Sequence, residues 1–180
     1  YIMHIPDRQP GILNPKYGIE GTKLNENIWR EPIVIDYNEI NEIIIDDIKY
    51  PNQSYRIDLK NLQLFNFEEE KIPFDEKKLS YWNSAFKNLR CGIFKPQLKP
   101  KDFDLIKRIF IKTSNNKDSL YIYDKNKIQL TKKEFNPSVE YKYASFNNSD
   151  LVIIQNNIFN KVLINLEEFL KFYNVKAQSL

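Results

Sequence analysis

The chain has few of the residues on which common enzyme sites depend. Its 180 residues include only four glycines, one histidine and one cysteine. The patterns of a dinucleotide-binding turn, a Walker loop and a nucleophilic-serine elbow are missing, and so few glycines argue against a loop that cradles phosphate. A zinc site would have to combine His4, Cys91 and carboxylates without the usual clustered ligand spacing. We therefore predict no cofactor, no metal and no enzymatic activity.

The single cysteine and the lack of long apolar runs bear on the compartment. Cys91 cannot form an internal disulfide, so nothing favours an oxidising compartment. It precedes Gly92 near the end of a predicted helix, away from the helix N-terminus that would lower its thiol pKa, and we interpret Cys91 and His4 as structural. No apolar run reaches the 18 residues of a membrane span, and the first residues lack a signal-peptide pattern. We expect a cytoplasmic protein that does not enter a membrane.

Charge is abundant but unevenly distributed along the chain. Residues 20–76 contain fourteen acidic and six basic side chains, whereas residues 77–133 contain fifteen basic and four acidic ones. Two interpretations remain open. The two segments lie against each other and neutralise their charges, or one of them presents its charge to a partner.

The pattern of apolar residues predicts one α+β domain with a mainly antiparallel sheet and about three helices packed on it. Residues 1–32 hold three of the four glycines and four prolines, so we expect an irregular N-terminal segment, with the sheet and helices in residues 33–180. Alternating or β-branched runs predict strands at 33–37, 42–49, 55–67 and 139–144, a hairpin over 120–130, and a second hairpin over 151–164 that turns at Asn156 and Asn157.

Three segments have the apolar spacing of helices. The first spans residues 75–92, with Asp75 as N-cap and Gly92 just after its end. The second begins near Pro100 and ends near Thr113. The third covers 165–173, where the four-residue spacing of Asn165 and Glu168 is that of a capping box.

The acidic stretch at residues 34–50 raises the possibility of a metal-dependent nuclease. Asp47 followed by Asp58 and Lys60 matches the spacing that such enzymes use to bind magnesium and hold the attacking water. However, an acid followed two residues later by lysine occurs at five other places in the chain, so the match is weak. We interpret these carboxylates as solvated groups on strand faces, and keep a nuclease-like toxin or effector as an alternative.

A second alternative is a nucleic-acid-binding module built on the basic segment 87–112. This segment interleaves lysines and arginines with Phe94, Phe103 and Phe110, a composition that suits phosphate contacts and base stacking. The phenylalanines fit the inward face of a helix better than a stacking platform, and we place this interpretation behind protein binding.

The beginning of the chain loosely resembles a known class of binding proteins. The opening Tyr1-Ile2-Met3, the Pro/Gly-rich excursion, Trp29 and the run PIVIDY are similar to the starts of small immunity proteins that accompany bacterial polymorphic and contact-dependent toxins. The resemblance implies a non-enzymatic protein that neutralises a cognate toxin by direct binding. It makes the acidic residues candidates for steering a basic toxin: Asp46, Asp47, Glu68, Glu69 and Glu70.

Overall fold

The computed structural model describes residues 19–20, 23–24, 33–35, 37, 39–74, 84–87, 89–91, 93–124 and 141–173. Its main element is a nine-stranded antiparallel sheet with the strand order β7-β6-β5-β4-β10-β11-β12-β13-β9. The strands are β4 (Glu42–Asp47), β5 (Tyr55–Asp58), β6 (Gln63–Asn66), β7 (Lys71–Ile72), β9 (Ile93–Phe94), β10 (Asp104–Lys112), β11 (Lys117–Asp124), β12 (Tyr141–Phe146) and β13 (Val152–Gln155).

Smaller elements accompany the sheet. Two short antiparallel ribbons pair β1 (Ile19–Glu20) with β2 (Lys23–Leu24), and β3 (Ile33–Ile35) with β8 (Leu89–Cys91). The α-helices in the described part of the chain are α4 (Asn156–Leu163) and α5 (Leu166–Tyr173). Three 3₁₀ turns complete the list: η1 (Pro51–Gln53), η2 (Ser84–Phe86) and η3 (Pro100–Asp102).

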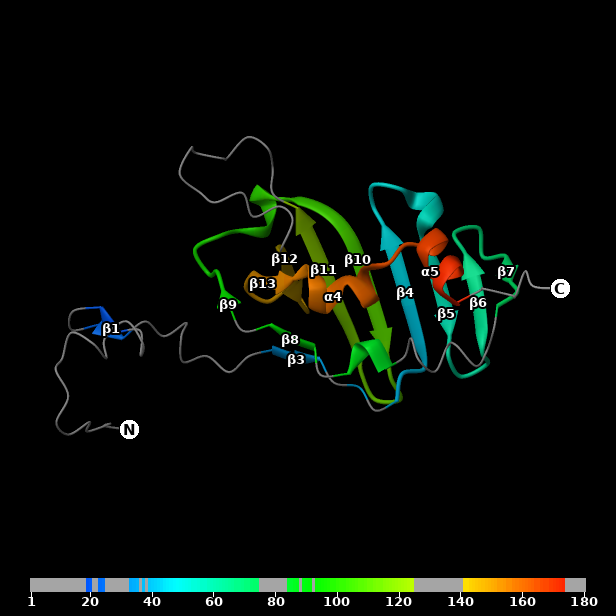
Figure 1. Cartoon of the computed structure of the whole chain (residues 1–180). Helices are drawn as coiled ribbons and strands as arrows, with labels where there is room; N and C mark the ends of the chain where they lie inside the picture. The colour runs from blue at the N-terminus through cyan, green and yellow to red at the C-terminus, as the bar shows by residue number, and fades with distance from the viewer. Residues whose placement is uncertain are drawn as a thin grey trace.

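One face of the sheet, called here the inner face, carries the core. Isoleucines lie directly opposite one another on neighbouring strands of this face. Ile43 of β4 lies opposite both Ile57 of β5 and Ile111 of β10. All three are fully buried. Figure 1 shows α4 and α5 across this side of the sheet, with the β3–β8 ribbon beside them. Phe159 and Phe169 of the two helices belong to the same apolar cluster, which explains why these strands alternate between buried and half-buried residues.

The outer face is covered by apolar residues over β11, β12 and β13. Tyr123 and Tyr143 lie opposite each other there and pack with Leu151 and Phe103, whose ring centroid is 4.7 Å from that of Tyr143. Phe103 follows η3, so the segment that enters β10 folds over this part of the face. Because both faces of the sheet are covered at this point, β11 has the run Leu-Tyr-Ile-Tyr and does not alternate between apolar and polar residues.

The expectation of about three helices on the sheet is wrong: the fold is mostly a large antiparallel sheet with two helices in its described part. The segment expected to be helical from Pro100 to Thr113 forms η3 and then the nine-residue strand β10. Its apolar spacing fits a helix, but Ile109 and Ile111 place β-branched side chains on one strand face, and pairing with β4 and β11 on both sides decides the outcome.

Two further boundaries differ from the predictions. Within the helix predicted at 75–92, residues 75–83, 88 and 92 lie outside the described residues, and the described remainder contains η2 and β8. The hairpin predicted to turn at Asn156 and Asn157 is instead strand β13 followed directly by α4, whose Phe159 and Val162 are buried at helical spacing.

The strand predicted over 55–67 is a hairpin. Asp58 ends β5, and its carboxylate accepts hydrogen bonds from the backbone and side-chain N–H groups of Asn61 at 2.9 and 2.7 Å. Leu62 then adopts a left-handed φ of 53°, which reverses the chain into β6.

The capping box before α5 is confirmed. The Glu168 N–H donates to Asn165 Oδ1 at 2.8 Å, and the Asn165 N–H donates to Glu168 Oε2 at 3.0 Å. Neither this helix nor α4 has the length and apolar character needed to cross a membrane, and the same holds for every helix in the described residues.

Candidate functional site at the loop end of the sheet

Neighbouring strands β4 and β10 bring acidic and basic residues together in register. Asp47 lies opposite Lys107, Asp46 opposite Arg108, and Glu42 opposite Lys112. Each of these three cross-strand pairs is also an ion pair, with N–O distances of 3.4, 3.3 and 3.8 Å. These residues come from the acidic segment 20–76 and the basic segment 77–133. Where β4 pairs with β10, the two segments therefore neutralise each other's charge, as the first of the two interpretations of the charge distribution expects.

The pair of Asp47 and Lys107 differs from the others because it is buried on the inner face. Their side chains are only 10% and 9% exposed. Lys107 Nζ donates to the Leu163 carbonyl oxygen at 2.6 Å, at the C-terminal end of α4. Burial lowers the pKa of the Lys107 ammonium, and Asp47 opposes that shift. Lys107 therefore attaches the sheet to the junction of the two helices.

Asp47 also organises the connection between β4 and β5. Its Oδ1 accepts the backbone N–H groups of Lys49 and Tyr50 at 3.1 and 2.9 Å, and its own N–H donates to Ser54 Oγ at 2.9 Å. Ser54 is buried, and η1 lies between these anchors. The connection from Ile48 to Ser54 is consequently held in one conformation, with the Tyr50 ring exposed.

The nuclease-like set is not brought together. Asp47 points to the inner face, whereas Asp58 lies opposite Glu42 on the outer face. Because Glu42 and Asp47 are the two ends of β4, the two aspartates are about 17 Å apart along the strands. Lys60 is exposed in the turn that follows β5. Among the described residues, no group of three His, Cys, Asp or Glu side chains could hold a metal ion.

Part of the positive charge of the basic segment 87–112 is already neutralised within the sheet. Lys107 is buried, and Arg108 and Lys112 are paired with acids of β4. Cys91 within this segment is 1% exposed, and burial raises the pKa of its thiol to about 12, so it is protonated at neutral pH. His4, the partner considered for it, lies outside the described residues.

The turn between β6 and β7 presents the other predicted acids. Asn66 fixes it: its Oδ1 accepts the backbone N–H groups of Glu68 and Glu70 at 3.0 and 2.8 Å. Glu69 has a left-handed φ of 59°, an uncommon conformation for a side-chain-bearing residue, and its carboxylate is bound by the Arg56 guanidinium. Arg56 in turn lies over the Phe65 ring, 3.9 Å from its centroid. The turn is therefore rigid before any partner binds.

The two rigid connections lie at the same end of the sheet. Tyr55 is opposite both Ile45 and Asn66, so the residues after β4 and after β6 leave the sheet side by side. We call the connection Ile48–Ser54 and the turn Phe67–Glu70 together the loop end, at the upper ends of β4 and β6 in Figure 1.

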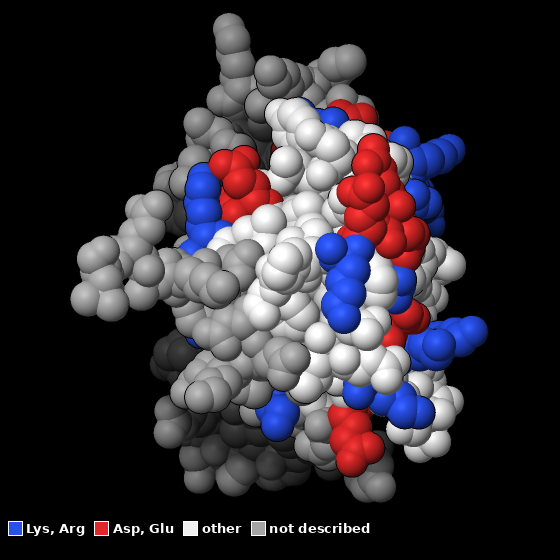
Figure 2. All heavy atoms as spheres, turned by 90° about the vertical axis from the view of Figure 1, so that its right-hand side faces the viewer, with Lys and Arg blue, Asp and Glu red and all other residues white. Residues whose placement is uncertain are grey.

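Exposed apolar side chains concentrate at the loop end. Three of the five large hydrophobic residues that are exposed in the described structure belong to it: Ile48 at 38%, Tyr50 at 54% and Phe67 at 59%. Next to them lie the carboxylates of Glu68 to Glu70. Figure 2, which faces the β7 edge, shows a band of acidic side chains with basic ones directly beside it. Exposed apolar groups with polar residues around them are typical of protein-binding surfaces.

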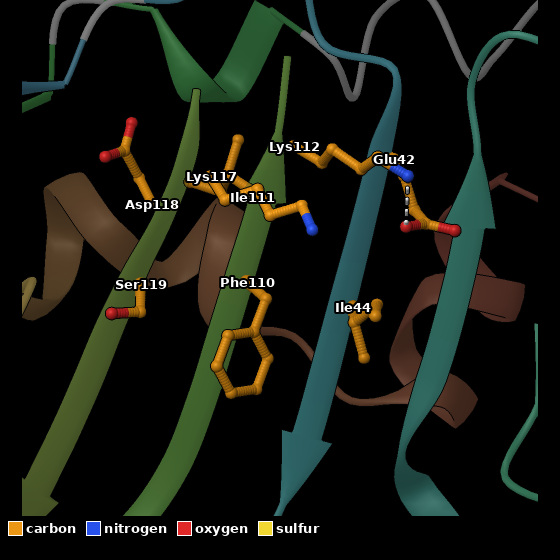
Figure 3. A pocket seen from close by; sticks show the side chains of 8 residues that line it. All are labelled: Glu42, Ile44, Phe110, Ile111, Lys112, Lys117, Asp118 and Ser119. Carbon is orange, nitrogen blue, oxygen red and sulfur yellow. Dashed lines mark ion pairs between the residues drawn. The ribbon is translucent and has the colours of Figure 1, made fainter. Parts of the chain in front are cut away.

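Two pockets flank the sheet. One, of about 250 Å³, lies beside the loop end and is lined by Asp47, Lys49, Tyr50, Lys107 and Lys142 among others. The larger one, of about 410 Å³, lies toward the opposite end of β4 and β10. Figure 3 shows it between the Phe110 and Ile44 side chains on one side and the Glu42–Lys112 ion pair on the other.

The five predicted partner-binding residues thus have different surroundings. All lie at or next to the loop end, but Asp46 is paired with Arg108, Asp47 is buried, and Glu69 is bound by Arg56. Glu70 accepts a hydrogen bond from the Asn66 side chain at 3.0 Å. Among these five residues, Glu68 is the one whose carboxylate has no hydrogen-bond or ion-pair partner in the described part of the chain.

Sequence reasoning missed the exposed apolar residues of this site. Phe67 gives one usable signal, because it ends an alternating run and is followed directly by three glutamates. Tyr50 gives none, since an aromatic residue before Pro51 is equally compatible with burial.

Comparisons of the chain with protein-family models, with curated proteins and with solved structures gave no match.

Proposed function

We propose that the protein is a non-enzymatic, cytoplasmic binding protein that neutralises a bacterial toxin, and that it binds the toxin through the loop end. The observation that carries the proposal is the concentration of exposed Ile48, Tyr50 and Phe67 on two rigid connections beside exposed glutamates. The loose resemblance of the first fifty residues to immunity proteins supports the choice of a toxin as partner.

Rigidity of the two connections favours binding. Tyr50 is held by the hydrogen bond that its backbone N–H donates to Asp47, and Phe67 precedes a turn fixed by Asn66. Because these connections are already ordered, their ordering costs little free energy when a partner binds. Aromatic side chains presented in this way are the residue types that dominate binding energy at interfaces.

The charges indicate a basic partner. Three consecutive glutamates, Glu68 to Glu70, follow Phe67 directly. The next basic residue along the chain is Lys71. Since Asp46 and Asp47 are already compensated by β10, long-range attraction would come from the glutamates of the turn. We therefore expect an apolar contact made by Tyr50 and Phe67, surrounded by positive charge on the toxin.

The test begins with the product of the gene next to this one. If that product is a toxin, co-expression of the protein should restore growth of a host that expresses it. The double variant Tyr50→Ala/Phe67→Ala should lose protection, with a dissociation constant at least about 30-fold higher in calorimetry, because the two anchors together are expected to contribute at least about 2 kcal/mol.

A matched control is available at the opposite end of β6. Leu62 is 40% exposed, and Ile158 of α4 is 43% exposed, yet neither belongs to the loop end. Leu62→Ala and Ile158→Ala should leave affinity unchanged. Loss of binding in these controls, with normal binding by the double variant, would contradict the assignment of the surface. Failure of the protein to bind or neutralise the toxin would contradict the proposed function itself.

A further inference from the structure

The pocket beside the loop end contains more positive than negative charge. Its lining includes three lysines and two aspartates, together with apolar side chains: Asp47, Lys49, Tyr50, Ile106, Lys107, Ile122, Asp124, Lys142 and Leu163. The proposed toxin-binding surface uses only the exposed ring of Tyr50 from this set, so the interior of the pocket has no assigned role.

The aspartates in the pocket are already committed. Asp47 Oδ2 is paired with Lys107 at 3.4 Å, and its Oδ1 accepts two backbone N–H groups. Asp124 is exposed and is engaged in an interaction of its own. The Asp47 carboxylate is therefore not left to compensate Lys142.

Lys142 lies on the inner face of β12, two residues before the fully buried Ala144. In the described structure its ammonium has no hydrogen-bond or ion-pair partner. It is close enough to Lys107 for its charge to help lower the pKa of the Lys107 ammonium, although burial is the main cause. Two ammonium groups therefore face one pocket, and the Asp47 carboxylate in its lining is already paired with Lys107. A bound anion would relieve this repulsion.

We infer that this pocket binds a small organic carboxylate, whose charge lies against Lys142 and whose apolar part contacts Ile106 and Ile122. The volume of about 250 Å³ suits a molecule of that size. A phosphate fits less well. A phosphate carries a charge of about −1.5 to −2 at neutral pH, larger than that of a carboxylate, and the residues that line the pocket include no arginine to compensate it.

The carboxylate has two possible sources, a free metabolite or an acidic side chain of a bound protein, and the same probe tests both without a partner present. The full chain, labelled with ¹³C at lysine Cε, is titrated with sodium benzoate at constant ionic strength and observed by NMR. We expect saturable shifts of the Lys107 and Lys142 signals. In Lys142→Met, and in the polar variant Lys142→Gln, the dissociation constant should rise at least tenfold.

Matched controls separate the effect of the Lys142 charge from the effects of other lysines and of the apolar ring of the probe. Lys117→Met removes a lysine at the opposite end of β11 and should not alter benzoate binding. Benzyl alcohol carries the same ring without the charge and should give no saturable shift. Saturable binding of benzyl alcohol, saturable binding of inorganic phosphate without binding of benzoate, or unchanged benzoate affinity in the Lys142 variants would each overturn the inference.

A final comparison separates the two sources. If the toxin supplies the carboxylate, benzoate at saturating concentration should weaken toxin binding by the wild-type chain at least tenfold, and Lys142→Met should weaken it to the same extent. If a metabolite occupies the pocket, toxin affinity should be unchanged by both. Because the NMR titration requires no toxin, its result is independent of the proposed function.

Discussion

The buried pair of Asp47 and Lys107 should be far more important for stability than the exposed pair beside it. Asp47 and Asp46 are consecutive residues of β4, and each faces a base of β10 at almost the same distance, 3.4 and 3.3 Å. They differ in environment. The side chains of the first pair are 9–10% exposed, and those of Asp46 and Arg108 are 33% and 41% exposed.

From these exposures the expected costs can be worked out. Asp47→Asn leaves the Lys107 ammonium buried without its counter-charge, so the free energy of unfolding should fall by about 3 kcal/mol. Asp46→Asn removes a solvated ion pair and should cost less than about 1 kcal/mol. Asparagine keeps the size of the side chain and can still accept the two backbone hydrogen bonds at position 47, which isolates the effect of charge.

Urea unfolding followed by circular dichroism would measure both values, and thermal unfolding should show a drop of about 6–12 °C for Asp47→Asn. A double-mutant cycle with Lys107→Met should give a coupling energy of about 2 kcal/mol for the buried pair and close to zero for Asp46 with Arg108→Met. Equal costs for the two asparagine variants would refute the argument that burial distinguishes the pairs.

Three further predictions concern single groups. The Tyr37 hydroxyl donates to Asp118 Oδ2 at 2.5 Å, and burial followed by this bond raises its pKa. Its stabilising contribution is complete below the unfolded pKa of about 10 and is lost at higher pH, so the advantage of wild type over Tyr37→Phe in urea unfolding should shrink between pH 8 and pH 11; an advantage that grows would refute it. Cys91 should react with a thiol reagent only after unfolding, and rapid modification of the native protein at pH 8 would contradict its burial. Asn165→Ala should lower the free energy of unfolding by about 1 kcal/mol, whereas a neutral result would mean that the cap before α5 is unimportant.

Local patterns predicted the elements whose stability is local. The strand β4 follows from its run of three consecutive β-branched isoleucines, and the start of α5 follows from the capping box at Asn165. Long-range pairing decided the others. The segment that became β10 has apolar spacing compatible with a helix, and nothing within it reveals that it will lie between β4 and β11.

The same limit applies to the candidate site. The adjacent acids Asp46 and Asp47, and the adjacent bases Lys107 and Arg108, are visible in the sequence, but their antiparallel register is set by the whole sheet. Alternation could have shown that two consecutive acids on a strand point to opposite faces, so only one of them could belong to a shared surface. Exposure of Tyr50 depends on hydrogen bonds around Asp47 and Ser54 that no short motif encodes.

The central claim, that the loop end binds the toxin, is tested most directly by hydrogen–deuterium exchange of the protein with and without the toxin bound. The account predicts slower exchange in residues 48–54 and 67–71 of the complex, and unchanged exchange in the turns at 59–62 and 113–116 at the opposite end of the sheet. Protection confined to those opposite turns, or no protection at the loop end in a saturated complex, would contradict it.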